Sequence, residues 1–297
     1  MARVVTVSTV QTPSGAMGDP RSVKQQNVDR ACEMLLEAGR RASDVALLPE
    51  IFPLTSIPLT PDNAQRLADE VPGDTFDRLS AIARAHHMFV LAPVFARCSG
   101  QLYNCTWILG RDGALAGEYH KAHPTQGEIS MGIVPGDRLP VFKLDFGTVG
   151  IMTCHDNSFP ETARCLALDG AEIVFWPHVQ SGWGDVAWDA VYYRSRTIDN
   201  HIFLVAACPG TPEGRAWMPG MMVGRSAIVG RDGFPLAEVG RHPGIATAVI
   251  DLDNPRLVGS FTRDGEEGPY WNFVLQDRRP EIYDALTRRG RDARAIG

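Results

Sequence analysis

One cysteine of the six in this chain stands where a nucleophile would be useful. Cys154 ends an apolar segment that begins at Gly150. Helix signals follow at once, because Pro160 suits a first helical turn and Glu161 suits the positive end of a helix dipole. Cys154 is therefore predicted in a sharp strand-to-helix turn at the carboxyl end of a strand, where open α/β sheets place their chemistry. The nearby helix N-terminus is expected to help lower the pKa of the thiol.

A cysteine nucleophile needs a base that takes its proton and a group that stabilises the oxyanion. Glu50 closes the apolar segment Leu47–Glu50, an unusual place for a carboxylate unless it faces a site. Lys121 ends the strand-like segment Gly117–Lys121. A carboxylate, an amine and a thiol at the ends of three strands indicate a converging set suited to nucleophilic catalysis.

The other five cysteines are predicted to be small buried hydrophobic residues. Cys165 falls inside the helix that follows Cys154, so it is expected in the core, and no polar group surrounds the remaining four in sequence: Cys32, Cys98, Cys105 and Cys208. No pair has CxxC spacing. Reduced thiols are therefore expected.

Hydrophobic periodicity predicts strands and helices in alternation, which is typical of an α/β domain. Strands are predicted over residues 4–10, 45–49, 88–96, 102–109, 114–119, 140–144, 147–153, 172–177, 201–208, 225–230, 234–239 and 245–251. Helices are predicted over residues 21–38, 75–86, 160–169, 187–199 and about 279–289. Gly39 is a candidate C-cap for the first helix.

A short internal repeat supports two similar halves. Ile108–Gly113 (Ile-Leu-Gly-Arg-Asp-Gly) recurs as Ile228–Gly233 (Ile-Val-Gly-Arg-Asp-Gly). Each Asp-Gly lies between two strand-like segments, and Asp-Gly supplies the positive φ angles of tight hairpins. Two similar hairpins suggest two similar sheets in one domain, although Asp-Gly turns are common enough for coincidence to remain an alternative.

Composition limits the classes of function. The chain has 297 residues, of which 44% are hydrophobic and 22% charged, so a sizeable core is expected and disorder is excluded. The net charge of −6 gives no electrostatic reason for a nucleic-acid or anionic-membrane partner. The apolar runs are too short for a membrane helix, and the N-terminus lacks the continuous apolar region of a signal peptide.

Several ordered segments of the chain resemble motifs of the nitrilase superfamily of carbon–nitrogen hydrolases. The matching segments are Val10-Gln11, Leu48-Pro49-Glu50, Tyr119–His123, Gly150–Glu161, Arg196–Asn200 and Gly224–Ser226. The segment around Cys154 has the form Gly-x-x-x-Cys-x-Asp-x-x-Phe-Pro-Glu with every gap correct. Glu128 stands where the family carries a second glutamate, and a solvated loop carboxylate is the alternative.

The resemblance implies a mechanism. Cys154 would attack a carbonyl carbon, and Glu50 would act as general base for the thiol and later for water. Lys121 would stabilise the developing negative charge, and Glu128 would orient Lys121 or the substrate. The backbone N–H of His155 could be a second oxyanion donor. Ammonia or an amine would leave, water would hydrolyse the thioester, and no metal or cofactor is required.

The resemblance also implies a fold and an assembly. The family fold is a four-layer αββα sandwich of two mixed β-sheets. We expect a single carbon–nitrogen hydrolase domain over residues 1–297, in which residues 268–297 form a C-terminal extension that contributes to oligomer contacts. A homodimer or a larger even homo-oligomer in the cytoplasm is expected, with no nucleic-acid or membrane partner.

The substrate is less constrained than the reaction. Cys154-His155-Asp156 does not match the Cys-Trp-Glu of nitrilases proper, so nitriles rank last. A small linear amide ranks first, and an N-carbamoyl amino acid or amine ranks second. The connecting segments 53–60, 178–188 and 209–222 are predicted to wall the pocket. Candidate substrate contacts are Trp176, His178 and Trp183, although each could be a packing residue.

Two rival functions remain. His120-x-x-His123 could belong to a metal site, but no Cys or Asp pair in sequence completes a tetrahedral set, so the metal reading is disfavoured. A catalytically silent binding scaffold of the same fold is the non-enzymatic alternative. The presence of all four candidate catalytic residues argues against it.

Overall fold

The computed structural model describes residues 3–181, 191–212, 214–254, 260–263, 266–269 and 275–288. The chain divides into two compact units, Met1–Asn254 and Pro255–Gly297. All the candidate site residues belong to the first unit. In the second unit, β13 (Ser260–Arg263) pairs with β14 (Glu266–Pro269) as an antiparallel hairpin.

The first sheet of the larger unit has six strands with three parallel strands at its centre. Its spatial order is β12 (Gly244–Asp251), β1 (Val4–Gln11), β2 (Val45–Leu47), β3 (Phe89–Cys98), β4 (Gln101–Leu109) and β5 (Leu115–His120). β1, β2 and β3 are parallel, and the outer pairings are antiparallel.

The second sheet repeats this arrangement. Its order is β6 (Val141–Lys143), β7 (Thr148–Ile151), β8 (Ile173–Pro177), β9 (Phe203–Ala207), β10 (Ala227–Val229) and β11 (Pro235–Glu238). β7, β8 and β9 are parallel, and the other pairings are antiparallel, as in the first sheet.

The repeated hexapeptide occupies equivalent hairpins in the two sheets. Gly113 turns the β4–β5 hairpin at φ +80°, and Gly233 turns the β10–β11 hairpin at φ +79°. Both glycines are needed, because a side chain in this region of φ is strained. Each hairpin also has a register shift beside the same residue of the repeat, Ile108 or Ile228.

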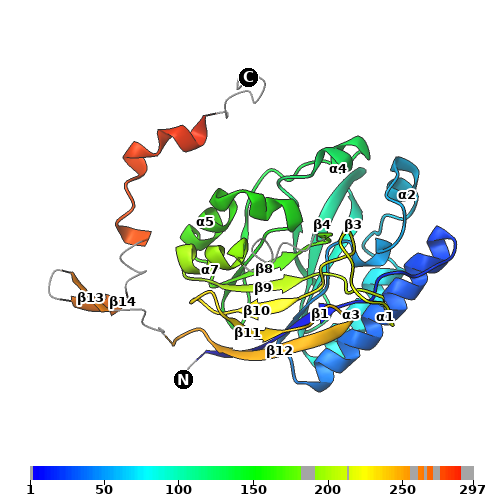
Figure 1. Cartoon of the computed structure of the whole chain (residues 1–297), viewed down its shortest axis with the longest axis horizontal. Helices are drawn as coiled ribbons and strands as arrows, with labels where there is room; N and C mark the ends of the chain where they lie inside the picture. Colours follow the sequence, from blue (N-terminus) through cyan, green and yellow to red (C-terminus); the bar gives the residue numbers. More distant parts are fainter. Residues whose placement is uncertain are drawn as a thin grey trace. The chain divides into compact units, whose positions relative to one another are not determined.

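Helices cover the outer faces of the two sheets, which gives four layers (Figure 1). α1 (Pro20–Arg40) and α3 (Asp74–His86) share a core with the first sheet, and α5 (Pro160–Leu168) packs against the second. α7 (Arg194–Asn200) contacts α5 and β9. A central core between the sheets joins residues of both, including Val7, Leu91, Ile151 and Phe175. The predicted αββα sandwich is therefore confirmed.

The longest helix shows how local sequence sets an element. The Asp19 side chain accepts hydrogen bonds from the amides of Arg21 and Ser22, and Pro20 occupies the first turn. The apolar face packs on β1, as its buried residues show: Val28, Ala31 and Leu35. The helix runs to Arg40, one residue beyond the predicted Gly39 cap.

Short elements depart most from the prediction. η1 (Phe52–Leu54), α2 (Pro61–Arg66), α4 (Gln126–Ser130) and η2 (Cys154–Ser158) were not predicted, because each is shorter than the window in which helical periodicity appears. The helix predicted at 279–289 is two 3₁₀ turns, η3 (Pro280–Ile282) and η4 (Asp284–Thr287). The start of the helix predicted at 187–199 lies partly outside the described residues.

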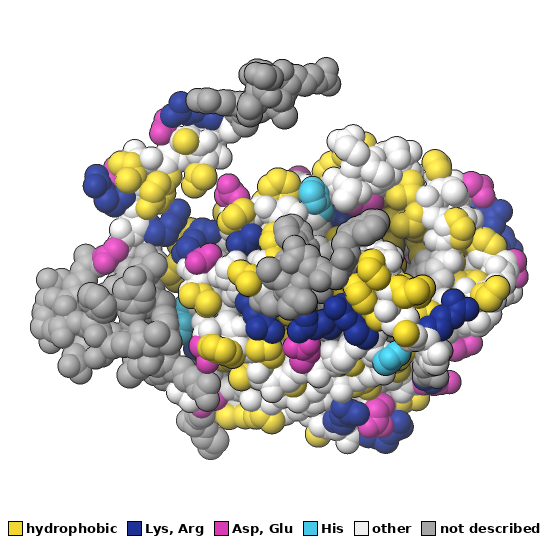
Figure 2. All heavy atoms as spheres, viewed as in Figure 1, with side chains coloured by type: hydrophobic (Ala, Val, Ile, Leu, Met, Phe, Trp, Pro, Cys, Tyr) yellow, Lys and Arg dark blue, Asp and Glu magenta, His cyan; other side chains and the backbone are white. Residues whose placement is uncertain are grey.

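The surface of the described part carries both signs of charge. On the face in Figure 2, Lys and Arg side chains are interspersed with Asp and Glu side chains. Within the described ranges, no helix has the length and apolar content that crossing a bilayer requires.

Candidate active site

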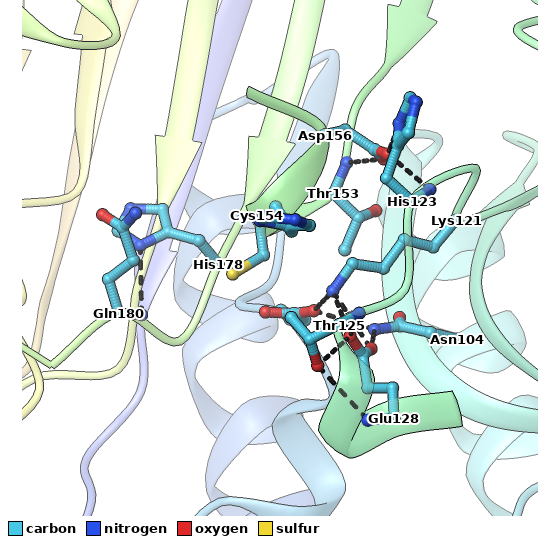
Figure 3. A network of polar contacts seen from close by, with 12 residues as sticks. Asn104, Lys121, His123, Thr125, Glu128, Thr153, Cys154, Asp156, His178 and Gln180 are labelled. Carbon is cyan, nitrogen blue, oxygen red and sulfur yellow. Dashed lines mark hydrogen bonds and ion pairs between the residues drawn. The ribbon is translucent and has the colours of Figure 1, made fainter. Parts of the chain in front are cut away.

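A buried lysine lies between two buried carboxylates, and all three residues line one pocket. Lys121 is 1% exposed, and its Nζ lies 2.8 Å from Glu50 Oε1. The same Nζ lies 3.0 Å from Glu128 Oε1 and 2.8 Å from Glu128 Oε2. Figure 3 shows Lys121, Glu128 and Cys154 directed toward one another from separate elements. The structure therefore brings together the four residues that the sequence proposed as catalytic.

Asn104, which the sequence analysis missed, joins the two carboxylates. Its Nδ2 donates to Glu50 Oε1 at 2.8 Å and to Glu128 Oε1 at 2.7 Å. The backbone of Lys121 also donates to the Asn104 carbonyl at 2.9 Å. The only sequence signal was a buried amide inside the apolar strand β4, and a buried amide usually has partners.

Backbone geometry aims each carboxylate at the lysine. Glu50 follows β2, and the next residue, Ile51, has φ +41° at the start of η1, so the chain turns sharply at this point. Glu128 lies in α4, where it forms a capping box with Thr125. Glu128 Oε2 also accepts from the Thr125 amide at 2.8 Å, which anchors the side chain.

Cys154 occupies a strained turn between β7 and α5. Its φ is +45°, a left-handed conformation that costs a non-glycine residue about 1–2 kcal/mol. Trp176 Nε1 donates to the Cys154 carbonyl at 3.0 Å, and the backbone of Val179 hydrogen-bonds the thiol. The predicted strand-to-helix turn is present, although its first element is the 3₁₀ turn η2.

The electrostatics of the thiol differ from the sequence expectation. Burial raises the pKa of Cys154 well above its ordinary value, and the nearby Glu50 charge raises it further. The expectation that a helix N-terminus lowers this pKa is therefore wrong for the free protein. The physical reason is that removing a thiolate from water costs more than Lys121 returns.

Burial and the charges of neighbouring residues shift the pKa values of Glu50, Glu128 and Lys121. Burial raises the pKa of Glu50, and the Lys121 charge opposes this shift. Burial would raise the pKa of Glu128, but the charge and hydrogen bond of Lys121, together with hydrogen bonds from Asn104 and Thr125, lower it. Burial alone would lower the pKa of Lys121, yet its acidic neighbours raise it, so the ammonium stays charged. Glu50 Oε2 is buried and takes no hydrogen bond from another N–H or O–H group of the described residues.

Asp156 fixes the turn that carries the nucleophile. This fully buried carboxylate accepts from Tyr119 Oη at 2.7 Å and from the Thr153 amide at 2.7 Å. Its other oxygen accepts from the His123 amide at 2.9 Å and lies 2.8 Å from His123 Nδ1. Asp156 stood in the cysteine motif, but two of its partners, Tyr119 and His123, lie on β5 and in the loop after it, and the sequence did not connect these segments.

We expect Asp156→Asn to destabilise the protein by about 1–3 kcal/mol, because an amide NH₂ would face donors that now bind a carboxylate oxygen. Urea unfolding measures this change. Asp169→Asn, which alters an exposed aspartate just after α5, is the control and should leave the free energy of unfolding nearly unchanged. Equal unfolding midpoints for the two variants would contradict this account of Asp156.

A pocket of about 350 Å³ opens onto these residues. Its polar lining residues are the four candidate catalytic residues together with Thr125 and Ser130. Its other walls include apolar side chains: Ile51, Leu59, Pro61, Phe95, Met131 and Val179. Of the predicted wall segments, 53–60 contributes Leu59 and 178–188 contributes Val179, whereas 209–222 contributes no lining residue among those described.

The proposed substrate contacts lie beside the nucleophile turn. Trp176 and His178 are buried and stacked with ring centroids 4.1 Å apart, and neither lines the pocket. Burial lowers the pKa of His178 to about 3, so its imidazole is neutral. Trp176 supports the Cys154 carbonyl, and substrate contact by either residue stays a prediction. Trp183 lies outside the described residues.

The remaining cysteines and histidines differ from the prediction in two ways. Cys165 is exposed on α5, so its assignment to the core is wrong, because its position on that helix faces away from the sheet. Cys98 and Cys105 do have polar neighbours, since His120 and Glu118 lie beside them. Hydrogen bonds from Cys105 and His120 lower the pKa of Cys98 to about 6.

Comparison with known proteins gives a consistent family match. The carbon–nitrogen hydrolase family model matches residues 6–258. An omega-amidase NIT2 of Xenopus tropicalis is 28% identical over 241 residues, which cover 78% of this chain and 85% of that protein. A deaminated glutathione amidase of Mus musculus is 30% identical over 282 residues, which cover 89% of this chain and 81% of that protein.

Solved structures share the fold. An amidase from Nesterenkonia sp. has a TM-score of 0.73 at 22% identity, and the match covers 95% of this chain and 96% of that chain. Nit3 of Saccharomyces cerevisiae, a member of branch 10 of the nitrilase superfamily, has a TM-score of 0.71 at 23% identity. That match covers 84% of this chain and 90% of the yeast chain.

Proposed function

We propose that Cys154 is the nucleophile and Glu50 the general base of this protein, which belongs to the carbon–nitrogen hydrolase family and is a thiol-dependent amidase-type enzyme. Lys121 then stabilises the oxyanion, and Glu128 holds Lys121 in place. The observation that carries these roles is the burial of Lys121 between two carboxylates at the polar end of the pocket that contains Cys154.

The first half of the reaction forms a thioester. Glu50 takes the thiol proton of Cys154, and the sulfur attacks the amide carbon to form a tetrahedral oxyanion. Lys121 Nζ and the backbone N–H of His155 donate to that oxyanion. Glu50 then returns the proton to the leaving nitrogen, the C–N bond breaks, and ammonia or an amine departs.

The second half restores the thiol. Glu50 takes a proton from water, and the hydroxide attacks the thioester carbon. The tetrahedral intermediate collapses with cleavage of the C–S bond, and the proton on Glu50 passes to the Cys154 sulfur. Because the thiol pKa is raised in the free protein, the cysteine enters each cycle protonated, and this supports a base-assisted attack.

The pocket favours a small linear amide with an apolar body. Its described walls are largely apolar, and Lys121, already paired with two carboxylates, is the single cationic side chain among the described lining residues. The names of the relatives describe them as amidases, which supports cleavage of an amide C–N bond with release of ammonia or an amine by this protein. N-carbamoyl compounds and nitriles rank behind amides.

A substrate screen with mass detection tests this proposal. Ammonia release is measured for short aliphatic amides, omega-amides of dicarboxylic acids, N-carbamoyl amino acids and nitriles. The expected result is turnover of amides and an acyl adduct that maps to Cys154 when the reaction is quenched at early times.

Cys165→Ala is the matched control, because it removes an exposed cysteine close in sequence to Cys154. This variant should retain both turnover and adduct. An acyl group on another cysteine, or amide turnover without any acyl-enzyme, would contradict the assignment of Cys154. The even homo-oligomer and the cytoplasmic location remain predictions.

A further inference from the structure

A second cluster of reactive side chains lies on the reverse face of the strands that carry the active site. Cys98 ends β3, Cys105 lies in β4, and His120 ends β5. In the antiparallel register, Cys105 is directly opposite His120. With Glu118, these residues offer four ligand atoms that all lie within 4.8 Å of one another.

The chemistry of this set is that of a zinc-class ion. Two thiols, an imidazole and a carboxylate provide four ligands, the number that Zn²⁺ takes in tetrahedral sites. Bonds of about 2.0–2.3 Å place tetrahedral ligand atoms roughly 3.3–3.8 Å apart. The side chains therefore need to close by only about an ångström, which rotamer adjustment can supply.

The cluster also contains a buried imidazole nitrogen that faces a carboxylate without forming a well-aligned hydrogen bond. His120 Nε2 is buried and makes no hydrogen bond within the described residues, although it lies 3.3 Å from Glu118 Oε1. The imidazole is held in place by Tyr103, which stacks on it with ring centroids 4.0 Å apart. A small cavity of about 40 Å³ borders His120 and Glu118, and Asp137 and Arg138 also line it.

We propose that Cys98, Cys105, Glu118 and His120 bind one zinc-class divalent cation. The site is separate from the catalytic chemistry, since it lies on the opposite face of the strands. Alternation of side chains along a strand puts Cys105 behind its neighbour Asn104, and His120 behind Lys121. A bound ion would therefore link β3, β4 and β5 on the face opposite Asn104 and Lys121, the two residues that hydrogen-bond the active-site carboxylates.

Metal titration of the full-length Cys154→Ala variant tests the site, because this variant removes the catalytic thiol as a competing ligand. The protein is reduced, stripped with a chelator and titrated with Co²⁺, then with Zn²⁺ in competition. We expect one Co²⁺ per chain with thiolate-to-metal charge-transfer absorption, displacement by Zn²⁺, and a melting temperature several degrees higher with metal. This readout does not depend on amidase activity.

Variants of the ligands locate the ion. In the same background, the pair Cys98→Ser and Cys105→Ser should abolish the charge-transfer band, whereas Cys165→Ser should not change it. Glu118→Gln keeps the size of a partly exposed side chain and should weaken Zn²⁺ binding at least tenfold without loss of folding. Glu118→Gln tests the site even if the cysteine variants fail to fold.

Three outcomes would overturn the proposal. The first is less than half an equivalent of Co²⁺ bound to folded, reduced protein. The second is a charge-transfer band that persists in the serine variants. The third is a Cys98–Cys105 disulfide, detected by thiol counting and peptide mass, with no metal bound after its reduction.

Discussion

Cys154→Ala and Glu50→Gln are each expected to lower kcat/KM for the best amide by about 10⁴-fold or more, the scale seen when members of a catalytic unit are removed. The thiol is protonated in the free protein, so it needs a base to become a nucleophile. Glu50 is the carboxylate whose free oxygen is available for this proton. Steady-state ammonia release measures the loss.

Nucleophile and base act in the same step, so their effects should not add. The double variant is expected to be no slower than Cys154→Ala alone. Glu161→Gln is the matched control, because it neutralises an exposed carboxylate in the same motif, and it should stay within a few-fold of the wild type. If the losses of kcat/KM in the two single variants multiply in the double variant, Glu50 does not act on the Cys154 thiol.

The pH profile gives a second readout of the base. Glu50 must be ionised to act, and burial raises its pKa above the usual value for a glutamate. Activity should therefore fall on the acid side at a higher pH than an ordinary glutamate would produce. The residual activity of Glu50→Gln should lack this acid limb, because glutamine does not titrate.

Lys121→Met is expected to remove activity and to lower the free energy of unfolding by about 3–5 kcal/mol at neutral pH. The substitution keeps the length of the side chain but leaves Glu50 and Glu128 buried without their counter-charge. Loss of an oxyanion donor alone lowers kcat by about 10²–10³-fold. Ammonia release and urea unfolding measure the two effects separately.

The pH dependence of this instability has a definite sign. Without Lys121, both buried carboxylates should have pKa values above those of the unfolded chain, so they favour folding only when protonated. In the wild type, Lys121 instead lowers the pKa of Glu128, which contributes stability that is lost as the pH falls. The difference between variant and wild type should therefore shrink from about pH 7 to about pH 5.

Two further variants separate the effect of buried charge on stability from the effect of Lys121 on amidase activity. Lys121→Met combined with Glu128→Gln removes one of the stranded charges, so it should regain part of the free energy of unfolding and remain inactive. Lys143→Met, in which the replaced lysine is exposed, should match the wild type in both measurements. Full stability of Lys121→Met at neutral pH would contradict the buried charge network.

Local sequence determined much of the fold and most of the proposed site. Alternating apolar residues predicted the strands of both sheets, and the repeated Asp-Gly segments predicted two equivalent hairpins. Glu50, Lys121 and Cys154 were recognisable because each polar group ends a predicted strand. These signals depend on backbone preferences and on neighbours within a few residues, so they are legible without the tertiary structure.

Contacts between distant segments were decided only by the tertiary structure. Asn104 joins Glu50 and Glu128 because β2, β4 and α4 meet, and no local pattern encodes that meeting. Strand register places Cys105 opposite His120, so a cysteine that the sequence assigned to core packing belongs to the proposed ligand set.

The charge state of the nucleophile shows the same division between local and tertiary information. The sequence placed Cys154 correctly in its turn, but burial of the thiol raised its pKa where the local dipole suggested a decrease. Solvent exclusion depends on the whole packed molecule, since a thiolate loses its hydration only when distant segments close over it. The sequence thus determined which groups are present, and the fold decided their protonation and their partners.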